Sequence, residues 1–294
     1  QIITFILGMG AIWALYLTAH ALRAQRFRIL LPTQLDYRAS FSALSIGYLA
    51  LHVFPFRLGE LVRPYLVREQ RQVPFGDSLA VVVIERILDV LMLLCMILAT
   101  SWFVELPLKV EVWGRDVLGL AQHGAGAVGV AGIVGVAVIV ALGPGALTWT
   151  DRLPGGSIFR RFREALVALA KRPAVAAQAL GLSVVIWLLT LFAVQLQLRA
   201  SAGVPSGFLD ALATWSVTLS GMTVLPTPGF FGGFEAACSA ALQLLGALPS
   251  AAAPFAIVLH LTQFVFTVAL GGVFLAIEGL SLREVVARSR EPDA

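Results

Sequence analysis

The sequence predicts an all-α polytopic membrane protein made of two inverted repeats, each with a re-entrant helical hairpin, and about five full spans. The first reason is composition, because 59% of the 294 residues are hydrophobic, only 13% are charged, and the mean hydropathy is +0.88. The second is that the 21 Lys and Arg residues stand in short clusters between apolar runs and leave a net charge of only +4. Such a chain is neither a secreted soluble domain nor a nucleic-acid-binding one.

Five apolar runs are long enough to cross a bilayer, whose hydrocarbon core needs about 20 residues of helix. They are residues 1–20, 75–104, 125–147, 173–197 and 250–278. Two other apolar runs, 41–56 and 209–225, are too short, and each precedes a half-length helix, 57–72 or 236–246. Each short run and its half-helix are therefore predicted to form a hairpin that enters the membrane and returns to the same side.

The distribution of Lys and Arg favours these hairpins over full crossings. The most basic segment is 152–172, and further basic residues follow the first apolar run and end the chain. With two hairpins, most Lys and Arg fall on one side of the membrane, whereas two full crossings would divide them equally. The sequence thus predicts a multi-pass protein of the cell inner (plasma) membrane with a cytoplasmic C-terminus.

A weak internal recurrence supports two halves. A shift of 175 residues places Glu60 on Glu235 and Glu85 on His260. An odd number of spans lies between the predicted hairpins, so the halves are expected to have opposite orientations, as in transporters built from inverted repeats. We expect a single transmembrane domain, 1–294, with repeat 1 at 1–104, a linking span and basic loop at 105–172, and repeat 2 at 173–280.

Six charged residues interrupt the apolar sequence of the first half and mark the predicted functional centre. They are Arg57, Glu60, Arg63, Glu85, Arg86 and Asp89. A charge at membrane depth costs about 2.5–3.5 kcal/mol on the insertion scale, so these residues should pair, line a wet cavity, or do both. We predict that they bind the substrate.

The second half has its own candidates for substrate binding, Glu235, His260 and Gln263. Glu235 would be costly against lipid, so it is expected to face a polar cavity. Backbone breaks near Glu60 and Glu235 predict hairpin tips, because Pro ends helices and Gly lets backbones approach closely. The predicted tip residues are Pro55, Gly59, Pro226, Pro228, Gly229 and Gly233.

Each of these groups also has a purely structural interpretation. Residues 57–72 could form an amphipathic helix on the cytoplasmic surface. A salt bridge between Arg86 and Asp89 could hold a helix bundle together, and it would still leave guanidinium donors for a phosphate. His260 and Gln263 share a helix face, where hydrogen bonding between helices competes with proton coupling as an explanation.

No catalytic, metal or cofactor site is predicted. Cys95 and Cys238 lie in apolar runs without Cys/His ligand spacing, and we expect both to be small core residues. Residues 226–233 lack the GxxxxGK[ST] pattern of a phosphate-binding loop. Neither a DxD or DDxxD spacing nor a Ser/His/Asp arrangement can be argued from the sequence. The chain is therefore predicted not to be an enzyme.

Three motifs together carry a resemblance to a known family. They are Pro55-Phe-Arg57-Leu-Gly59-Glu60, Glu85-Arg86-x-x-Asp89, and Leu225-Pro226-Thr-Pro228-Gly229 followed by Phe234-Glu235. Over nearly its whole length the chain resembles the lysylphosphatidylglycerol synthase transmembrane region, also called the flippase-like domain family. The resemblance implies the movement or handling of amphipathic lipids, such as aminoacylated phosphatidylglycerol, polyprenyl-linked sugars or hopanoids.

The chain departs from the family pattern at two points. His260 stands where an Arg is common, which affects the second half's contact with an anionic headgroup. No soluble aminoacyl-transferase domain follows the last span, so lysyl transfer is not expected of these residues.

We expect a lipid transporter, or flippase, that moves a lipid with an anionic or polar headgroup across the inner membrane through a polar cavity between the hairpins. The alternative is a membrane-embedded enzyme or an accessory subunit in glycolipid, hopanoid or aminoacyl-lipid synthesis. The implied partners are the membrane lipid and lipid-biosynthetic enzymes, and no nucleic acid or cofactor is expected.

Overall fold

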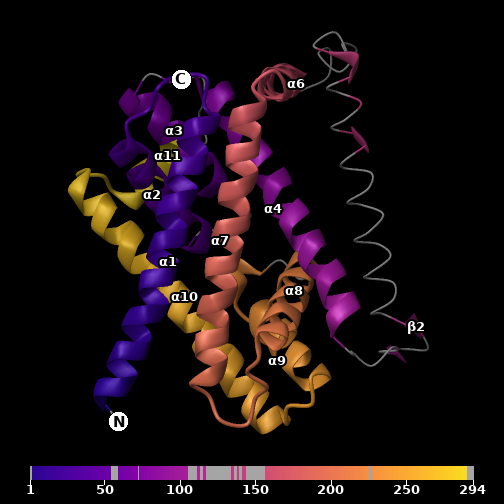
Figure 1. Ribbon diagram of the computed structural model, residues 1–294. Coiled ribbons are helices and arrows are strands. Elements are labelled where there is room, and N and C mark those ends of the chain that lie inside the picture. Colours follow the sequence, from indigo (N-terminus) through magenta and orange to yellow (C-terminus); the bar gives the residue numbers. More distant parts are fainter. Residues whose placement is uncertain are drawn as a thin grey trace. The chain divides into compact units, whose positions relative to one another are not determined.

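The computed structural model describes residues 2–53, 59–71, 73–104, 156–224 and 227–289, with a few positions between 111 and 143. The regular secondary structure of these residues is helical apart from one antiparallel pair of two-residue strands, β1 (Glu111–Val112) and β2 (Arg115–Asp116). The helices (Figure 1) are α1 (Ile2–Leu30), α2 (Tyr37–Val53), α3 (Gly59–Arg71), α4 (Phe75–Phe103), α6 (Gly156–Ala170), α7 (Pro173–Arg199), α8 (Phe208–Val224), η3 (Pro228–Phe230), α9 (Gly233–Leu244), α10 (Pro249–Ile277) and α11 (Leu282–Ser289). The predicted helical class is confirmed.

The local sequence explains where several helices begin and end. α7 and α10 begin at Pro173 and Pro249, and proline suits the first helical position because an N–H there has no partner within the helix. α2 begins after Asp36, whose Oδ2 accepts a hydrogen bond of 3.2 Å from the backbone N–H of Ala39. α1 ends two residues before Pro32, which cannot continue a helix.

The two short helices of each half pack against each other, α2 against α3 and α8 against α9. A Cβ added at Gly59, the first residue of α3, would lie 2.1 Å from the backbone N of Leu51 in α2. A Cβ at Gly221 in α8 would lie 2.6 Å from the Cβ of Ala237 in α9. Glycine at both positions therefore allows the paired helices to approach closely.

Gly59→Ala is expected to destabilise the protein by about 1–3 kcal/mol, because the added methyl group meets backbone atoms that must shift. The matched control is Gly181→Ala, since Gly181 is an exposed residue of α7 with no atom within 4 Å of its added Cβ. This control should be neutral or stabilise by about 0.5–1 kcal/mol. Thermal unfolding of the purified variants, followed by tryptophan fluorescence, measures both effects, and equal melting temperatures would contradict the prediction.

The described helices recur in the same order and with similar lengths. α3 and α4 begin at residues 59 and 75, and α9 and α10 begin at residues 233 and 249, which is 174 residues later in both cases. α2 and α8 have 17 residues each, and α4 and α10 have 29 each. Counted from the helix starts, Arg86 and His260 occupy the same position in α4 and α10. The opposite orientation of the halves and the re-entry of the hairpins stay predictions.

The chain divides into two compact units, each with its own hydrophobic core. Unit 1 takes residues from 1–19, 90–129 and 185–266, and unit 2 takes residues from 20–89, 130–184 and 267–294. The pair α2–α3 belongs to unit 2, whose core includes Phe27, Ile46 and Leu66. The pair α8–α9 belongs to unit 1, whose core includes Leu242 and Leu259. The predicted division into consecutive repeats stays a prediction.

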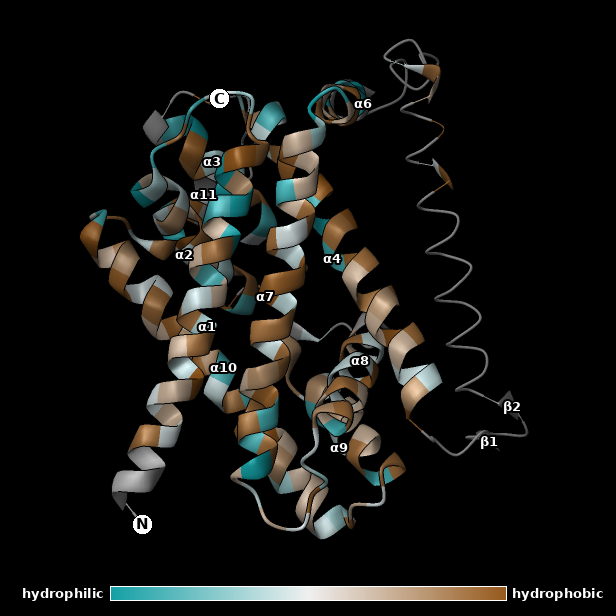
Figure 2. Cartoon of the chain, in the orientation of Figure 1, coloured by the Kyte–Doolittle hydropathy of each residue, from teal (hydrophilic) through white to brown (hydrophobic). Residues whose placement is uncertain are grey.

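Two of the described helices, α7 and α10, are long and apolar enough to cross a membrane. Exposed apolar side chains recur every fourth residue along α7, at Leu180, Val184, Leu188, Phe192 and Leu196. This spacing forms a slowly winding stripe on one helix, as expected for a surface that contacts lipid. Figure 2 shows hydrophobic colours along the second half of α4 as well. The other full spans stay predictions, and 125–147 lies almost entirely outside the described residues.

Three sequence-based expectations are wrong. α1 does not end near residue 20 but continues to Leu30, because Ala24 and Phe27 keep an apolar face at helical spacing. The basic segment 152–172 contains the helix α6, which buries Arg163 and Leu166 and exposes Arg160, Arg161 and Glu164. Cys95 is exposed, since it lies on an outward side of α4, whereas Cys238 is buried as expected.

Candidate functional site

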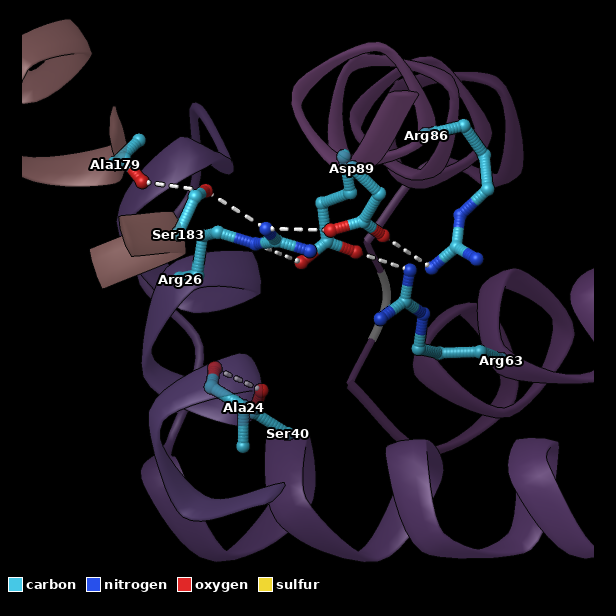
Figure 3. A network of polar contacts seen from close by, with 9 residues as sticks. Ala24, Arg26, Ser40, Arg63, Arg86, Asp89, Ala179 and Ser183 are labelled. Carbon is cyan, nitrogen blue, oxygen red and sulfur yellow. Dashed lines mark hydrogen bonds and ion pairs between the residues drawn. The ribbon is translucent and has the colours of Figure 1, made fainter. Parts of the chain in front are cut away.

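Arg26 of α1 is the centre of a buried charge network in unit 2 (Figure 3). Its Nε lies 3.3 Å from Glu85 Oε1, and its Nη1 lies 2.9 Å from Asp89 Oδ1. The same Nη1 donates to Ser183 Oγ of α7 at 2.8 Å. The side chains of Arg26 and Glu85 are each only 1% exposed. The network therefore ties α1, α4 and α7 together through buried polar groups.

Two further arginines contact Glu85 and Asp89 on the side opposite Arg26. Arg63 of α3 donates through Nη2 to Glu85 Oε2, and Arg86 Nη2 lies 3.1 Å from Asp89 Oδ2, one turn along α4. Figure 3 shows Arg26 on one side of Asp89 and both Arg63 and Arg86 on the other. Each carboxylate thus contacts two arginines.

All four carboxylate oxygens of Glu85 and Asp89 are engaged by guanidinium groups. Removing charges from water costs several kcal/mol per ion, and a buried charge is tolerated only when its partners are well placed. The two carboxylates satisfy this condition for Arg26. What remains unused in the network is donor capacity on the arginines, because each guanidinium carries five N–H groups.

Arg63, Arg86 and Glu60 line one small, partly open pocket of unit 2. The other lining residues are Leu44, Gly47, Tyr48, Leu51, Gly59 and Val82. The Arg86 side chain is 38% exposed, and its buried Nε has no hydrogen-bond partner among the described residues. Glu60 is the only carboxylate among the described residues of this lining. The pocket wall therefore carries more guanidinium than carboxylate groups.

Unit 1 holds a second, smaller polar cluster. Glu235 Oε1 lies 2.7 Å from His260 Nδ1 of α10, and Glu235 Oε2 accepts a hydrogen bond of 2.7 Å from the backbone N–H of Gly232. Glu235 thus also satisfies a backbone donor at the start of α9. His260 is 2% exposed, and its ring stacks on Phe234 with the ring centres 4.6 Å apart.

The structure brings most of the predicted site residues into these two clusters. Glu60, Arg63, Glu85, Arg86 and Asp89 gather in unit 2, and Glu235 and His260 pair in unit 1. Gln263 lies one turn after His260 on α10, and its buried Nε2 has no partner among the described residues. Their role in substrate binding stays a prediction.

The predicted hairpin tips are described only in part. Pro55, Arg57 and Pro226 lie outside the described residues. Pro228 begins η3, Gly229 has a φ of +61°, and Gly233 begins α9. The positive φ suits glycine, which has no Cβ to clash in the left-handed region.

Arg26 and Ser183 are the network residues that sequence reasoning missed. From the sequence, Arg26 follows the apolar run that ends near residue 20 and belongs to a basic cytoplasmic segment. The missed signal is the apolar positions at helical spacing that continue to Pro32 and place Arg26 within a helix. Ser183 carries no signal of its own, since isolated serines are common in membrane helices.

The fold and these clusters define a helical membrane protein with charged residues buried among its helices. The chain belongs to the family of the lysylphosphatidylglycerol synthase TM region, which it matches over residues 3–271. This confirms the family resemblance. The chain is also 26% identical over 318 aligned positions to the protein named Glycosyltransferase AglD of Haloferax volcanii, and the match covers 96% of this chain and 51% of that protein. The chain thus spans about half the length of this curated relative, and no solved structure matches it.

Proposed function

We propose that this protein is a lipid transporter that moves an amphipathic lipid with an anionic or polar headgroup across the membrane. The headgroup binds in the pocket lined by Arg63, Arg86 and Glu60. Membership in a family named for a membrane region of phospholipid synthesis supports a lipid as the substrate.

The observation that carries this proposal is the state of Arg86. Asp89 engages one end of its guanidinium, while 38% of the side chain is exposed and Nε has no partner in the described part of the chain. A planar guanidinium held in place by a carboxylate is well suited to bind a phosphate through its remaining donors. Arg63 is oriented in the same way by Glu85.

A structural salt bridge explains one side of the network but not the other. Arg26 is 1% exposed and engages Glu85, Asp89 and Ser183, which is what a fixed interhelical link requires. Arg86 is far more exposed although it belongs to the same network. Arg26 therefore stabilises the fold, and Arg86, which is exposed at the pocket, binds the ligand.

The setting we propose is the inner (plasma) membrane, with several crossings and a cytoplasmic C-terminus. The clusters of Lys and Arg between apolar runs support this topology. The close packing within α2–α3 and within α8–α9 supports the two short runs as helical hairpins.

The second candidate function is that of a membrane domain serving lipid-linked synthesis, as an enzyme part or an accessory subunit. The observation that favours it is the similarity to half of a protein named a glycosyltransferase. In that case the same pocket would hold a lipid intermediate without moving it between leaflets.

Lipid movement in vesicles reconstituted with the purified protein tests the proposal. Fluorescent phosphatidylglycerol or phosphatidylcholine is placed in the vesicles, and an impermeant quencher measures the fraction that has changed leaflet. We expect the protein to accelerate leaflet exchange over protein-free vesicles, and phosphatidylglycerol to exceed phosphatidylcholine because the pocket favours anions. Binding of phosphatidylglycerol without any exchange would overturn transport in favour of the second candidate.

A further inference from the structure

Glu235 and His260 form a titratable pair that headgroup binding in unit 2 does not use. Nδ1 of His260 lies 2.7 Å from Glu235 Oε1, and the histidine is 2% exposed. Nε2 of the same ring is buried and has no hydrogen-bond partner within the described residues. One ring nitrogen is therefore bonded to Glu235, and the other is buried without a partner among the described residues.

The carboxylate fixes which nitrogen can take up a proton. Glu235 Oε1 can only accept, so Nδ1 must carry the hydrogen of this bond. In the neutral ring, Nε2 is then the bare, basic nitrogen. A proton that arrives must bind at Nε2, and this changes the pair from a net charge of −1 to zero.

Two aromatic rings lie beside the His260 ring. Phe234 stacks face to face on the His260 ring with the ring centres 4.6 Å apart, and its face can attract an imidazolium. The tilted ring of Phe231 lies 4.8 Å away. A neutral pair is also less costly to bury than a lone carboxylate.

The helices α8, α9 and α10 carry few charged residues besides this pair. Among the residues of α8, α9 and α10, the carboxylates are Asp210 and Glu235, and there is no Lys or Arg. Asp210 accepts from the backbone N–H of Gly207 at the start of α8. The remaining titratable group of these helices besides His260 is the buried thiol of Cys238. Protonated His260 is thus the only cation that these three helices can supply.

We propose that the Glu235–His260 pair binds the proton that drives lipid movement, so that an anionic lipid and a proton cross the membrane together. This inference rests on the proposed transport function. The proton binds at Nε2 from the water on one side and leaves from Nε2 to the water on the other, and no covalent bond to the lipid forms or breaks. While the proton is bound, the pair no longer carries the net negative charge that would repel an anionic lipid, which links proton uptake to uptake of the anion.

The test uses the reconstituted vesicles with a pH gradient across the membrane, about pH 6 on one side and about pH 8 on the other, which brackets the ordinary histidine range. Labelled phosphatidylglycerol reports lipid movement, and a trapped pH-sensitive dye reports proton movement. In the wild type, lipid should accumulate on the alkaline side, and protons should move with it. His260→Gln should lose the accumulation and the proton signal.

His52→Gln is the matched control, because His52 contacts the carbonyl oxygen of Tyr48 at 2.8 Å rather than a carboxylate. It should respond to the gradient as the wild type does. Glu235→Asp should keep the response, whereas Glu235→Gln should lose it, since a neutral amide no longer stabilises the imidazolium. The Gln side chain keeps an acceptor for Gly232, so a correctly folded α9 is expected in both variants.

The outcomes separate this inference from the proposed function. Lipid exchange that ignores the gradient in the wild type, or that persists unchanged with its proton signal in His260→Gln, overturns the coupling but leaves transport standing. If the wild type moves no lipid, the proposed function fails. The ring itself can then be followed by NMR of ¹⁵N-labelled histidine, where the absence of any titration at Nε2 would overturn the proton site as well.

Discussion

Glu85→Ala is expected to lower the stability of the protein by about 3–5 kcal/mol, the usual cost of removing one partner of a buried ion pair. Glu85 is 1% exposed and holds Arg26 through one oxygen and Arg63 through the other. Without it, two arginines lose their shared counter-ion in a setting where water cannot replace it. Arg26 keeps Asp89, so the larger loss falls on Arg63.

Thermal unfolding and gel filtration of the purified variant measure this effect. The matched control is Asp77→Ala, because Asp77 lies on the same helix and pairs with Arg161 at 2.9 Å. Both side chains of that pair are partly exposed, at 29% and 43%, so its loss should cost no more than about 1 kcal/mol. A Glu85→Ala protein that unfolds at the same temperature as Asp77→Ala would show that the network does not hold the fold.

Arg86→Gln is expected to reduce the exchange of anionic lipid about tenfold or more while the protein stays folded. A hydrogen bond to a charged group contributes about 1.5–3 kcal/mol, and the variant loses the donors that the open side of the guanidinium offers. Stability should change little, because Arg86 is 38% exposed and Asp89 keeps Arg26 as its partner. The vesicle assay with phosphatidylglycerol measures the rate, and the melting temperature measures the fold.

Arg161→Gln is the control, since Arg161 also pairs with a carboxylate and is 43% exposed but does not line the pocket of Arg86 and Glu60. It should exchange lipid as the wild type does. Arg86→Lys should be intermediate, because lysine keeps the charge and loses the planar fork. Wild-type exchange by Arg86→Gln would contradict headgroup binding in this pocket, and aggregation of both Arg86 variants would support a purely structural salt bridge.

The choice of α4 as the centre of the site could be made from the sequence because charges in an apolar run are costly. Glu85, Arg86 and Asp89 within one helix had to be paired, and the bond between Arg86 and Asp89 follows from their spacing alone. The ends of α3, α4, α7 and α10 were also predictable to within a few residues, since Pro and Gly mark them. Glu235 was expected to need a polar neighbour for the same reason.

The identity of distant partners could not be predicted in this way. Arg26 and Glu85 are 59 residues apart, and Arg26 and Ser183 are 157 apart. Their contacts depend on which helices are neighbours and on the rotation of each helix about its axis, and neither follows from the periodicity of a single segment. The pairing of Glu235 with His260 could not be predicted for the same reason, because it depends on α9 and α10 being neighbours.

Three properties of this protein follow from its sequence: it is helical, it lies in a membrane, and the charges of α4 need partners. Each follows from the cost of placing polar groups in lipid. How the charges are shared depends on the packing of the helices. This packing placed Arg26 on the buried side of Glu85 and Asp89 and left Arg86 at an open pocket beside Glu60. The physical reason is that exposure is a property of packed surfaces, and two arginines of identical chemistry acquire different roles only when neighbouring helices cover one and not the other.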